Sequence, residues 1–215
     1  MEIYDTEEQQ VEAVKRWWAE NGQACIVGLV LGFIAIFAWN YWQDYKKEQQ
    51  FQASAIYEKV LKAAEENKKE TVEKLTAHLE EQYKNTPYAV YSDLLLAKTK
   101  VDANDIPAAK QILQDVIAKS DKQLSHIARI RLVRLLLATG EFEQGLQLIN
   151  AVNAKAESGF SGSYDELTGD LYVALNRPDE ARSSYQSALR NGQQSPLLQF
   201  KIDDLTAPEK VEIQK

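Results

Sequence analysis

Residues 24–39 read ACIVGLVLGFIAIFAW, and no charged side chain interrupts this run. Uncharged residues extend it at both ends, to residues 23–42. A helix needs about 20 mainly apolar residues to cross the hydrocarbon core of a bilayer. Length and composition therefore predict one transmembrane helix at residues 23–42.

All four tryptophans lie at the ends of this run. Trp17 and Trp18 precede it, and Trp39 and Trp42 close it. Tryptophan is enriched where lipid meets water. Two alternatives are a buried core helix and a cleaved signal peptide. A core helix is seldom apolar on all sides, and no small-residue cleavage site follows the run, so we expect a retained membrane anchor.

Small residues lie on one side of the predicted span. Gly28 and Gly32 form a GxxxG pattern, which lets two helices approach closely in lipid. Both glycines are therefore candidate positions for packing against another transmembrane helix, although the pattern is also common by chance. Upstream, Asn21 and Gly22 can introduce a bend between the span and an amphipathic helix expected at residues 7–20.

The remainder of the chain has the composition of a water-soluble protein. Its 215 residues are 27% charged and carry a formal net charge of −7, which is far too polar for several spans. Six acidic and two basic residues precede the span, and 26 acidic and 23 basic residues follow it. Neither part offers the basic surface that nucleic-acid binding needs. The charges leave the orientation open, because long domains translocate largely regardless of charge.

The residues that usually carry chemistry are scarce. Cys25 is the only cysteine, so no disulfide can form within the chain. His78 and His126 are the only histidines, they fall in different predicted helices, and neither belongs to an HExxH motif. The sequence also lacks GxGxxG and P-loop motifs. We therefore expect a non-enzyme with no catalytic residue, cofactor site or metal site.

The soluble part contains helical patterns only. Residues 44–67 lack glycine and proline, so the anchor helix is expected to continue through them. The apolar positions expected in this continuation include Phe51, Ala55, Val60 and Ala64. After residues 67–69 a second helix is expected, with Val72, Leu75, Leu79 and Tyr83 among its apolar positions. Thr86 is expected to cap the next helix, with Pro87 at its first position.

Beyond residue 87 the sequence repeats with a period of 36 residues. Asn104, Gly140 and Asn176 mark the equivalent turns. Small residues recur at fixed distances from these turns, at Ala97, Gly169, Ala109, Gly145 and Ala181. This layout is typical of tetratricopeptide units, in which small residues let two antiparallel helices approach. The predicted fold is all-α, with one N-terminal transmembrane helix followed by a tetratricopeptide-like α-solenoid of antiparallel helix pairs at residues 43–205.

The ends and the middle of this array differ in character. Residues 125–138 are apolar on nearly all sides, so neighbours should cover this helix in the middle of the stack. Residues 195–202 are expected to form the closing helix, capped by Ser195 and polar on its outer face. Residues 154–164 are expected to be the most mobile connection, and residues 206–215 a disordered tail.

A stack of helix pairs can bind a segment of another chain along its inner side. The first helix of each repeat mainly lines that side. The candidate groove residues are Tyr91, Leu94, Lys98 and Val101 in the first repeat, Ile127, Ile130, Arg134 and Leu137 in the second, and Glu166, Asp170 and Val173 in the third. The apolar members can equally be ordinary core. Lys98 and Arg134 are better candidates because core packing has no use for them, with solvated surface as the alternative.

Both ends of the sequence carry motifs that are characteristic of a known family. MEIY at residues 1–4, VEAVKRWWAENG at 11–22 and KIDDL at 201–205 enclose the anchor and the repeats, and together they resemble the YfgM family of Gram-negative bacteria. The resemblance implies an ancillary subunit of the SecYEG translocon in the inner membrane. It also implies that residues 1–22 are cytoplasmic and residues 43–205 periplasmic. The implied partners are SecYEG, the membrane-anchored chaperone PpiD and unfolded secretory proteins as they emerge.

Two other functions remain open. Members of the family are also linked to the Rcs envelope-stress response. Residues 1–22 would then sequester its response regulator, making the protein a membrane-bound negative regulator. The other alternative is a tetratricopeptide assembly factor of the outer membrane. Such proteins are normally lipidated, and Cys25 lies deep in the apolar run without a lipobox.

Overall fold

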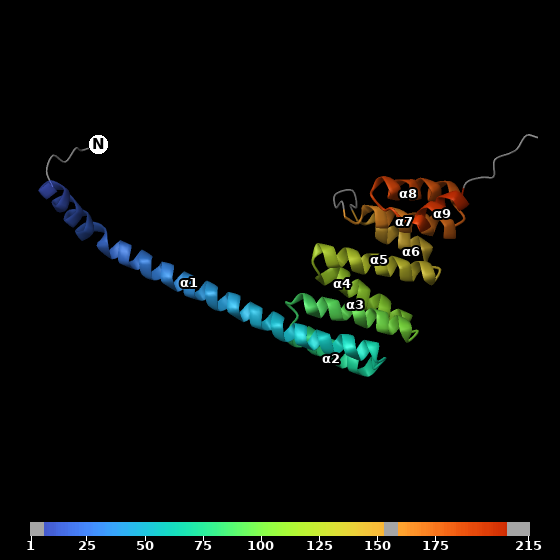
Figure 1. Ribbon diagram of the computed structural model, residues 1–215, viewed down its shortest axis with the longest axis horizontal. Coiled ribbons are helices and arrows are strands. Elements are labelled where there is room, and N and C mark those ends of the chain that lie inside the picture. The colour runs from blue at the N-terminus through green and yellow to red at the C-terminus, as the bar shows by residue number, and fades with distance from the viewer. Residues whose placement is uncertain (1–6, 153–158, 206–215) are drawn as a thin grey trace, which may run out of the picture. The chain divides into compact units, whose positions relative to one another are not determined.

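The computed structural model describes residues 7–152 and 159–205 (Figure 1). Within these ranges the chain forms nine helices and no strand, which confirms the predicted all-α fold. They are α1 (Glu7–Glu65), α2 (Lys69–Gln82), α3 (Pro87–Asp102), α4 (Ile106–Lys119), α5 (Lys122–Ala138), α6 (Phe142–Asn150), α7 (Ser161–Ala174), α8 (Pro178–Arg190) and α9 (Pro196–Asp204). The chain divides into two compact units after Gln52.

The first unit contains the long, exposed part of α1. Its apolar side chains are uncovered in every direction around the helix, and Phe37, for example, is 70% exposed. By length and composition α1 can cross a membrane, and only 6% of its most apolar window is buried within the chain. A core helix would have these side chains covered by its own chain. The exposure of these side chains therefore favours a membrane anchor over a core helix.

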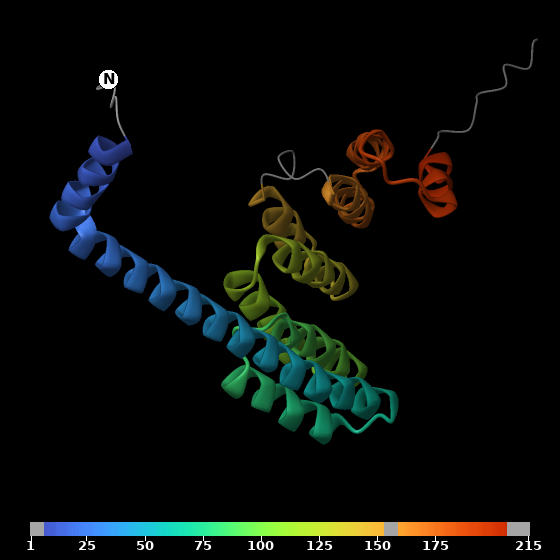
Figure 2. The same ribbon diagram turned by 60° about the vertical axis from the view of Figure 1, so that its left-hand side comes forward.

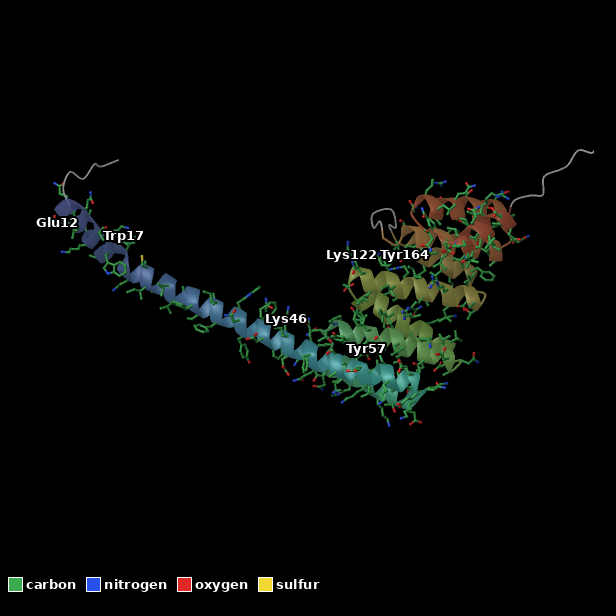
Figure 3. All side chains as sticks on the ribbon, in the orientation of Figure 1. Glu12, Trp17, Lys46, Tyr57, Lys122 and Tyr164 are labelled. Atoms are coloured by element: carbon green, nitrogen blue, oxygen red, sulfur yellow. The ribbon has the colours of Figure 1, made fainter. Side chains whose placement is uncertain are left out.

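Asn21 and Gly22 lie inside α1 and do not end it. The Asn21 amide donates a hydrogen bond to the Trp17 carbonyl oxygen at 3.1 Å, and Gly22 lies against the Trp18 indole. Figure 2 shows α1 changing direction in its first part while remaining helical. Further along, the Lys46 ammonium lies 3.6 Å from the centroid of the Trp42 ring (Figure 3).

The second unit contains the repeats, and the three predicted turns join α3 to α4, α5 to α6 and α7 to α8. Asn104, Gly140 and Asn176 have positive φ angles of 61°, 82° and 57°. At Asn104, the next amide, of Asp105, donates to the Lys100 carbonyl at 2.8 Å, which is the hydrogen bond of a Schellman helix end. Equivalent bonds close the other two turns. Asparagine and glycine occur here because they tolerate the left-handed conformation that the turn requires.

The structure adds a fourth pair. Both of its helices were predicted, but the sequence analysis did not recognise them as a repeat unit. The last turns of α1 and the whole of α2 pack together around a core of Ala53, Val60, Ala63, Val72 and Leu79. Asn67 forms the turn between them, with a φ of 58° and the same pattern of hydrogen bonds. It precedes Asn104 by 37 residues, so the repeat begins one unit earlier than predicted.

Two of the apolar positions proposed for this part of α1 are wrong. Phe51 is 71% exposed and Ala55 is also exposed, whereas Ala53, Val60 and Ala63 are buried. Composition alone did not distinguish the faces, because α1 is apolar on several sides in this region. The face toward α2 is fixed by packing against Val72 and Leu79.

The small residues of the repeats have the predicted role in close packing. A Cβ atom added to Gly169 would lie 2.3 Å from the ring of Tyr185, and one added to Gly145 would lie 2.9 Å from the Leu171 side chain. Helix α5 lies in the middle of the array, as predicted. Its Leu132 belongs to the core shared with α3 and α4, while its Val133 belongs to the core shared with α6 and α7.

The closing helix α9 is only partly as predicted. The Ser195 hydroxyl accepts a hydrogen bond from the Leu198 amide at 3.1 Å, which confirms the cap. The outer face is not polar, however, because Leu197 and Phe200 are 60% and 68% exposed. Lys201 holds the helix in place through ion pairs with Glu166 and Asp170 of α7, at 2.9 and 2.7 Å.

Thr86 does occupy the position before α3, but its side chain does not cap that helix. The hydroxyl donates to the Tyr83 carbonyl oxygen at 2.8 Å instead. Pro87 is at the start of α3, as predicted. Residues 154–158 of the expected mobile connection and the expected tail at residues 206–215 lie outside the described residues. The rest of the expected connection is partly wrong, because residues 161–164 begin α7 and Tyr164 is 1% exposed.

Candidate partner-binding groove

A cavity of about 390 Å³ opens between the first helices of two neighbouring repeats, α3 and α5. We call it the α3–α5 cavity. It is lined by Leu94, Ala97, Lys98 and Val101 of α3, Leu113 of α4, and Arg131, Arg134, Leu135 and Ala138 of α5. Six of these side chains are aliphatic and three are cationic. This size and composition suit the side chains of a binding partner.

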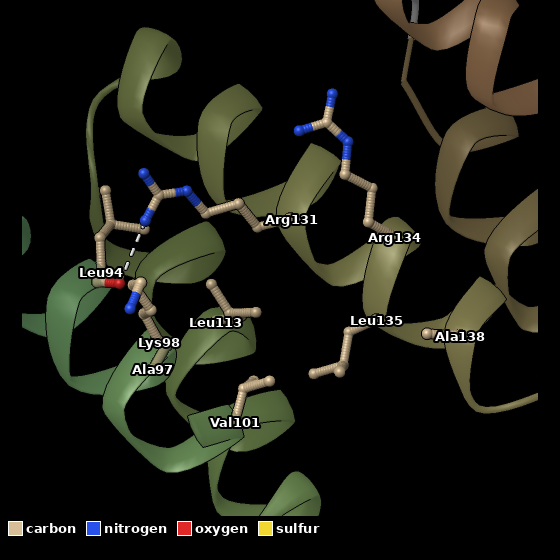
Figure 4. A pocket seen from close by; sticks show the side chains of 9 residues that line it. All are labelled: Leu94, Ala97, Lys98, Val101, Leu113, Arg131, Arg134, Leu135 and Ala138. Atoms are coloured by element: carbon tan, nitrogen blue, oxygen red, sulfur yellow. Dashed lines mark hydrogen bonds between the residues drawn. The ribbon is translucent and has the colours of Figure 1, made fainter. Parts of the chain in front are cut away.

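Helical spacing brings these residues to one place. On α3 they occupy positions i, i+3, i+4 and i+7, which lie on one face of a helix. The same intervals recur on α5. Ala97 and Ala138 have the shortest side chains in the lining, so the space between the two helices stays unfilled. In Figure 4, Leu113 and Leu135 extend into this space.

The three cations differ in what they contact. Lys98 forms an exposed ion pair with Asp102 at 2.7 Å, one turn along α3. Arg131 donates a hydrogen bond to the Leu94 carbonyl oxygen at 3.1 Å (Figure 4), which leaves its charge without a carboxylate partner. Within the described residues, Arg134 has neither a hydrogen bond nor an ion pair. No acidic side chain is among the residues that line the cavity.

A tyrosine cluster lies one helical turn before the cavity. It consists of Tyr57 of α1 with Tyr88 and Tyr91 of α3, whose ring centroids are 5.8 to 5.9 Å apart. Burial raises the pKa of the Tyr57 hydroxyl, and the nearby Arg131 charge opposes that shift. Arg131 thus connects the tyrosine cluster with the α3–α5 cavity. Packed tyrosines of this kind combine a large apolar area with a polar tip.

The structure separates the predicted groove residues into groups. Lys98, Val101 and Arg134 line the cavity, and Tyr91 belongs to the tyrosine cluster. Leu94 also borders the cavity but is a core residue, 6% exposed. Ile130 is buried in the core, and Ile127 and Leu137 are partly buried against it. In the third repeat, Glu166 and Asp170 pair with Lys201, while Val173 is 45% exposed.

Sequence reasoning missed Arg131, Leu135 and Ala138 on α5. The sequence analysis placed the groove residues of α5 36 positions after those of α3. This spacing predicts the inward face of each repeat by itself. The cavity residues of α5 instead follow those of α3 by 37 positions, as Arg131 follows Leu94. One extra residue rotates the face by about 100°, and this turns the side of α5 toward α3. The missing signal was therefore the contact between repeats.

The glycines of the predicted span and the buried histidine are the remaining positions that the sequence analysis singled out. A Cβ atom added to Gly28 or Gly32 would meet nothing within 4 Å. His126 is buried, with Nδ1 2.7 Å from the Tyr164 hydroxyl and its ring stacked on Phe160. Among described residues, no group of three or more His, Cys, Asp or Glu side chains could hold a metal ion.

Comparison with known proteins agrees with this architecture. The model of the tetratricopeptide repeat-like domain family matches residues 15–207. A protein of Escherichia coli (strain K12) named ancillary SecYEG translocon subunit is 31% identical over 213 residues, which cover 96% of this chain and 100% of that protein. The chain belongs to the YfgM family. A second member, from Aggregatibacter actinomycetemcomitans, has the same name and is 32% identical over 93% of this chain and 97% of its own length.

A solved structure provides a comparison at the level of the fold. MamA from Desulfovibrio magneticus RS-1, residues 41 to the end, aligns with a TM-score of 0.54 over 71% of this chain and 82% of that chain. The two sequences are 15% identical, so the likeness concerns the fold alone. It supports the arrangement of helix pairs on which the α3–α5 cavity depends.

Proposed function

We propose that this protein is a membrane-anchored ancillary subunit of the SecYEG translocon, and that it acts by binding proteins rather than by catalysis. The observation that carries the proposal is the similarity over the whole chain to proteins named ancillary SecYEG translocon subunit. The exposed apolar part of α1 supports it, because a membrane anchor would keep the protein beside a membrane-embedded channel.

The proposed topology is a single span with the N-terminus in the cytoplasm and the repeats in the periplasm. The orientation comes from the family resemblance, since the charge distribution favours neither direction strongly. In this arrangement the anchor keeps the repeats near the exit of the channel. Tethering raises their effective concentration there, so weak contacts with passing chains suffice.

The α3–α5 cavity and the tyrosine cluster are the surfaces that we assign to partner binding. The proposed partners are the chaperone PpiD and secretory proteins that have not yet folded. An open apolar cavity next to exposed cations suits recognition of a side chain and its charge. Such a surface needs no cofactor, in accordance with a binding role.

Copurification from membranes in a mild detergent tests the proposal. Tagged full-length protein should recover SecYEG and PpiD. A matched control in which residues 23–42 are replaced by an unrelated apolar helix should stay in the membrane and recover less of the translocon. Failure of the unmodified protein to recover SecYEG, from membranes in which SecY and SecE remain associated, would contradict the proposal.

The alternative role in the Rcs response rests on resemblance alone. Replacing residues 1–22 with an unrelated soluble segment separates the two functions. Our proposal predicts unchanged copurification with SecYEG and unchanged stress signalling. Altered Rcs signalling with intact translocon association would favour the alternative.

A further inference from the structure

We propose that the α3–α5 cavity binds a polypeptide segment in which a carboxylate side chain neighbours aliphatic or aromatic side chains. The inference rests on the proposed function, because it specifies the chemistry of the segment that a partner protein presents. The apolar side chains would enter the cavity and the carboxylate would pair with Arg134. The argument combines the lining of the cavity, the charges beside it and the tyrosine cluster.

The lining favours insertion of an apolar side chain. Six aliphatic residues line about 390 Å³ of space that opens to the surface. Four of them, Leu94, Ala97, Leu113 and Leu135, also belong to the core and are 2–8% exposed, so Val101 and Ala138 offer most of the accessible apolar surface. An apolar hollow that is open at the surface often marks a binding site. An aliphatic or aromatic group from a partner would remove this surface from water, which is favourable in proportion to the apolar area covered.

The charges specify what lies beside that apolar group. Some lysines elsewhere in the repeats have carboxylate partners, as Lys100 has Glu73 at 2.7 Å and Lys119 has Glu80 at 2.5 Å. Arg131 and Arg134 have none within the described residues, although the whole chain carries a net charge of −7. A guanidinium without a carboxylate, beside an apolar surface, is complementary to a carboxylate from another molecule.

The tyrosine cluster extends the site in the direction of α1 and favours a polypeptide over a small ligand. Tyr91 is 37% exposed at the end of the cluster that is nearest to the cavity along α3. A chain that fills the cavity can therefore continue over aromatic rings. Tyrosines of this kind are frequent anchors in protein interfaces.

Binding of labelled peptides to the full-length protein in nanodiscs tests the inference. The probe is a short fluorescent peptide containing two leucines and two glutamates in a serine-glycine background, and binding is followed by anisotropy. A second peptide replaces both glutamates by glutamine and a third replaces them by lysine. We expect the glutamate peptide to bind at least about tenfold more tightly than the glutamine peptide, because charged hydrogen bonds contribute more than neutral ones.

Two variants and one control locate the site. Arg134→Glu should weaken the glutamate peptide at least about tenfold and improve binding of the lysine peptide. Ala138→Leu should weaken all three peptides by filling the cavity. Arg190→Glu makes the same charge change on exposed α8 and should leave binding unchanged. Circular dichroism of each variant confirms that the repeats remain folded.

Several results would overturn the inference. They are equal binding of the glutamate and glutamine peptides, equal effects of Arg134→Glu and Arg190→Glu, or displacement of the peptide by dodecanoate at lower concentration than by unlabelled peptide. The last result would assign the cavity to a fatty acid. Copurification with SecYEG is measured separately, so its loss with peptide selectivity intact would refute the proposed function alone.

Discussion

Two helical segments of this protein are rich in apolar residues, and their surroundings differ. In α1, residues 24–39 expose their side chains, whereas in α5 Leu132 and Val133 are 2% and 0% exposed. Helix α5 also carries Arg129, Arg131 and Arg134, while residues 24–39 carry no charge. An apolar helical segment is therefore surrounded either by protein or by lipid. Charged residues within the segment indicate protein, and their absence indicates lipid.

The largest expected difference concerns leucines in the two helices. Leu132→Ala should lower the free energy of unfolding of the repeats by about 2–5 kcal/mol, because it opens a cavity in the core around α5. Leu31→Ala should change it by less than about 0.5 kcal/mol, because Leu31 is 60% exposed. Urea unfolding of the full-length protein in detergent, followed by circular dichroism, measures both. Equal effects would contradict the comparison.

Two glycines provide a second comparison, with a somewhat smaller expected difference in the free energy of unfolding. Gly169→Ala should cost about 2–3 kcal/mol, since the new Cβ atom would collide with the ring of Tyr185. Gly28→Ala should leave unfolding unchanged, because nothing in the chain lies within 4 Å of its added Cβ. The same urea titration measures the two variants. If Gly28→Ala instead reduces copurification with SecYEG, the predicted packing role of this glycine gains support.

A buried carboxylate further distinguishes the repeats from the apolar run. Burial and the nearby Glu80 raise the pKa of Asp93 to about 6, and Lys119 only partly opposes the shift. The folded state therefore binds this proton more tightly than the unfolded chain. The contribution of Asp93 to stability accordingly falls as pH rises from about 4 to about 6.

Removing this carboxylate should flatten the pH profile. Raising the pKa of Asp93 from 3.8 to about 6 corresponds to about 3 kcal/mol. Asp93 borders a pocket that Glu80 and Lys119 also line, and solvent in that pocket reduces our expectation to about 2 kcal/mol. Asp93→Asn should lose that decline between pH 4 and 6, as measured by urea unfolding at several pH values. A variant whose pH profile matches the unmodified protein would show that Asp93 is not the responsible group.

The smallest expected effect concerns the groove. Arg134→Gln should change the free energy of unfolding by less than about 0.5 kcal/mol, because Arg134 is exposed and forms no ion pair within the described residues. Lys201→Gln is the informative partner, since it removes two ion pairs that hold α9. It should destabilise the repeats measurably in the same titration. A larger loss from Arg134→Gln would indicate a structural role for that arginine.

Much of the fold could be predicted because it depends on local patterns. The apolar run of α1 and the turns at Asn104, Gly140 and Asn176 follow from residue type and spacing. The first pair was missed because Asn67 follows a long helix that begins in the anchor, so no preceding turn marked the start of a repeat. The exposure of Leu197 and Phe200 was missed because a sequence does not state which face of a final helix remains uncovered.

The groove could be predicted only in part. Lys98 and Arg134 were singled out because core packing does not explain charged residues, and both line the α3–α5 cavity. Arg131 was not, because its position depends on how α5 rotates toward α3. Ile130 has the periodicity expected of a groove residue but is 8% exposed in the core. Periodicity identifies a face of a helix, whereas only packing determines what that face meets.

Photo-crosslinking in intact membranes tests most directly whether lipid surrounds the apolar part of α1 and protein surrounds α5. A photoreactive residue is placed at Leu31 in one variant and at Arg134 in another. We predict that Leu31 gives adducts with lipid or with membrane-embedded subunits of SecYEG, and that Arg134 gives adducts with soluble segments of partner proteins. Adducts of Leu31 with soluble proteins, together with release of the protein from membranes without detergent, would contradict the membrane anchor.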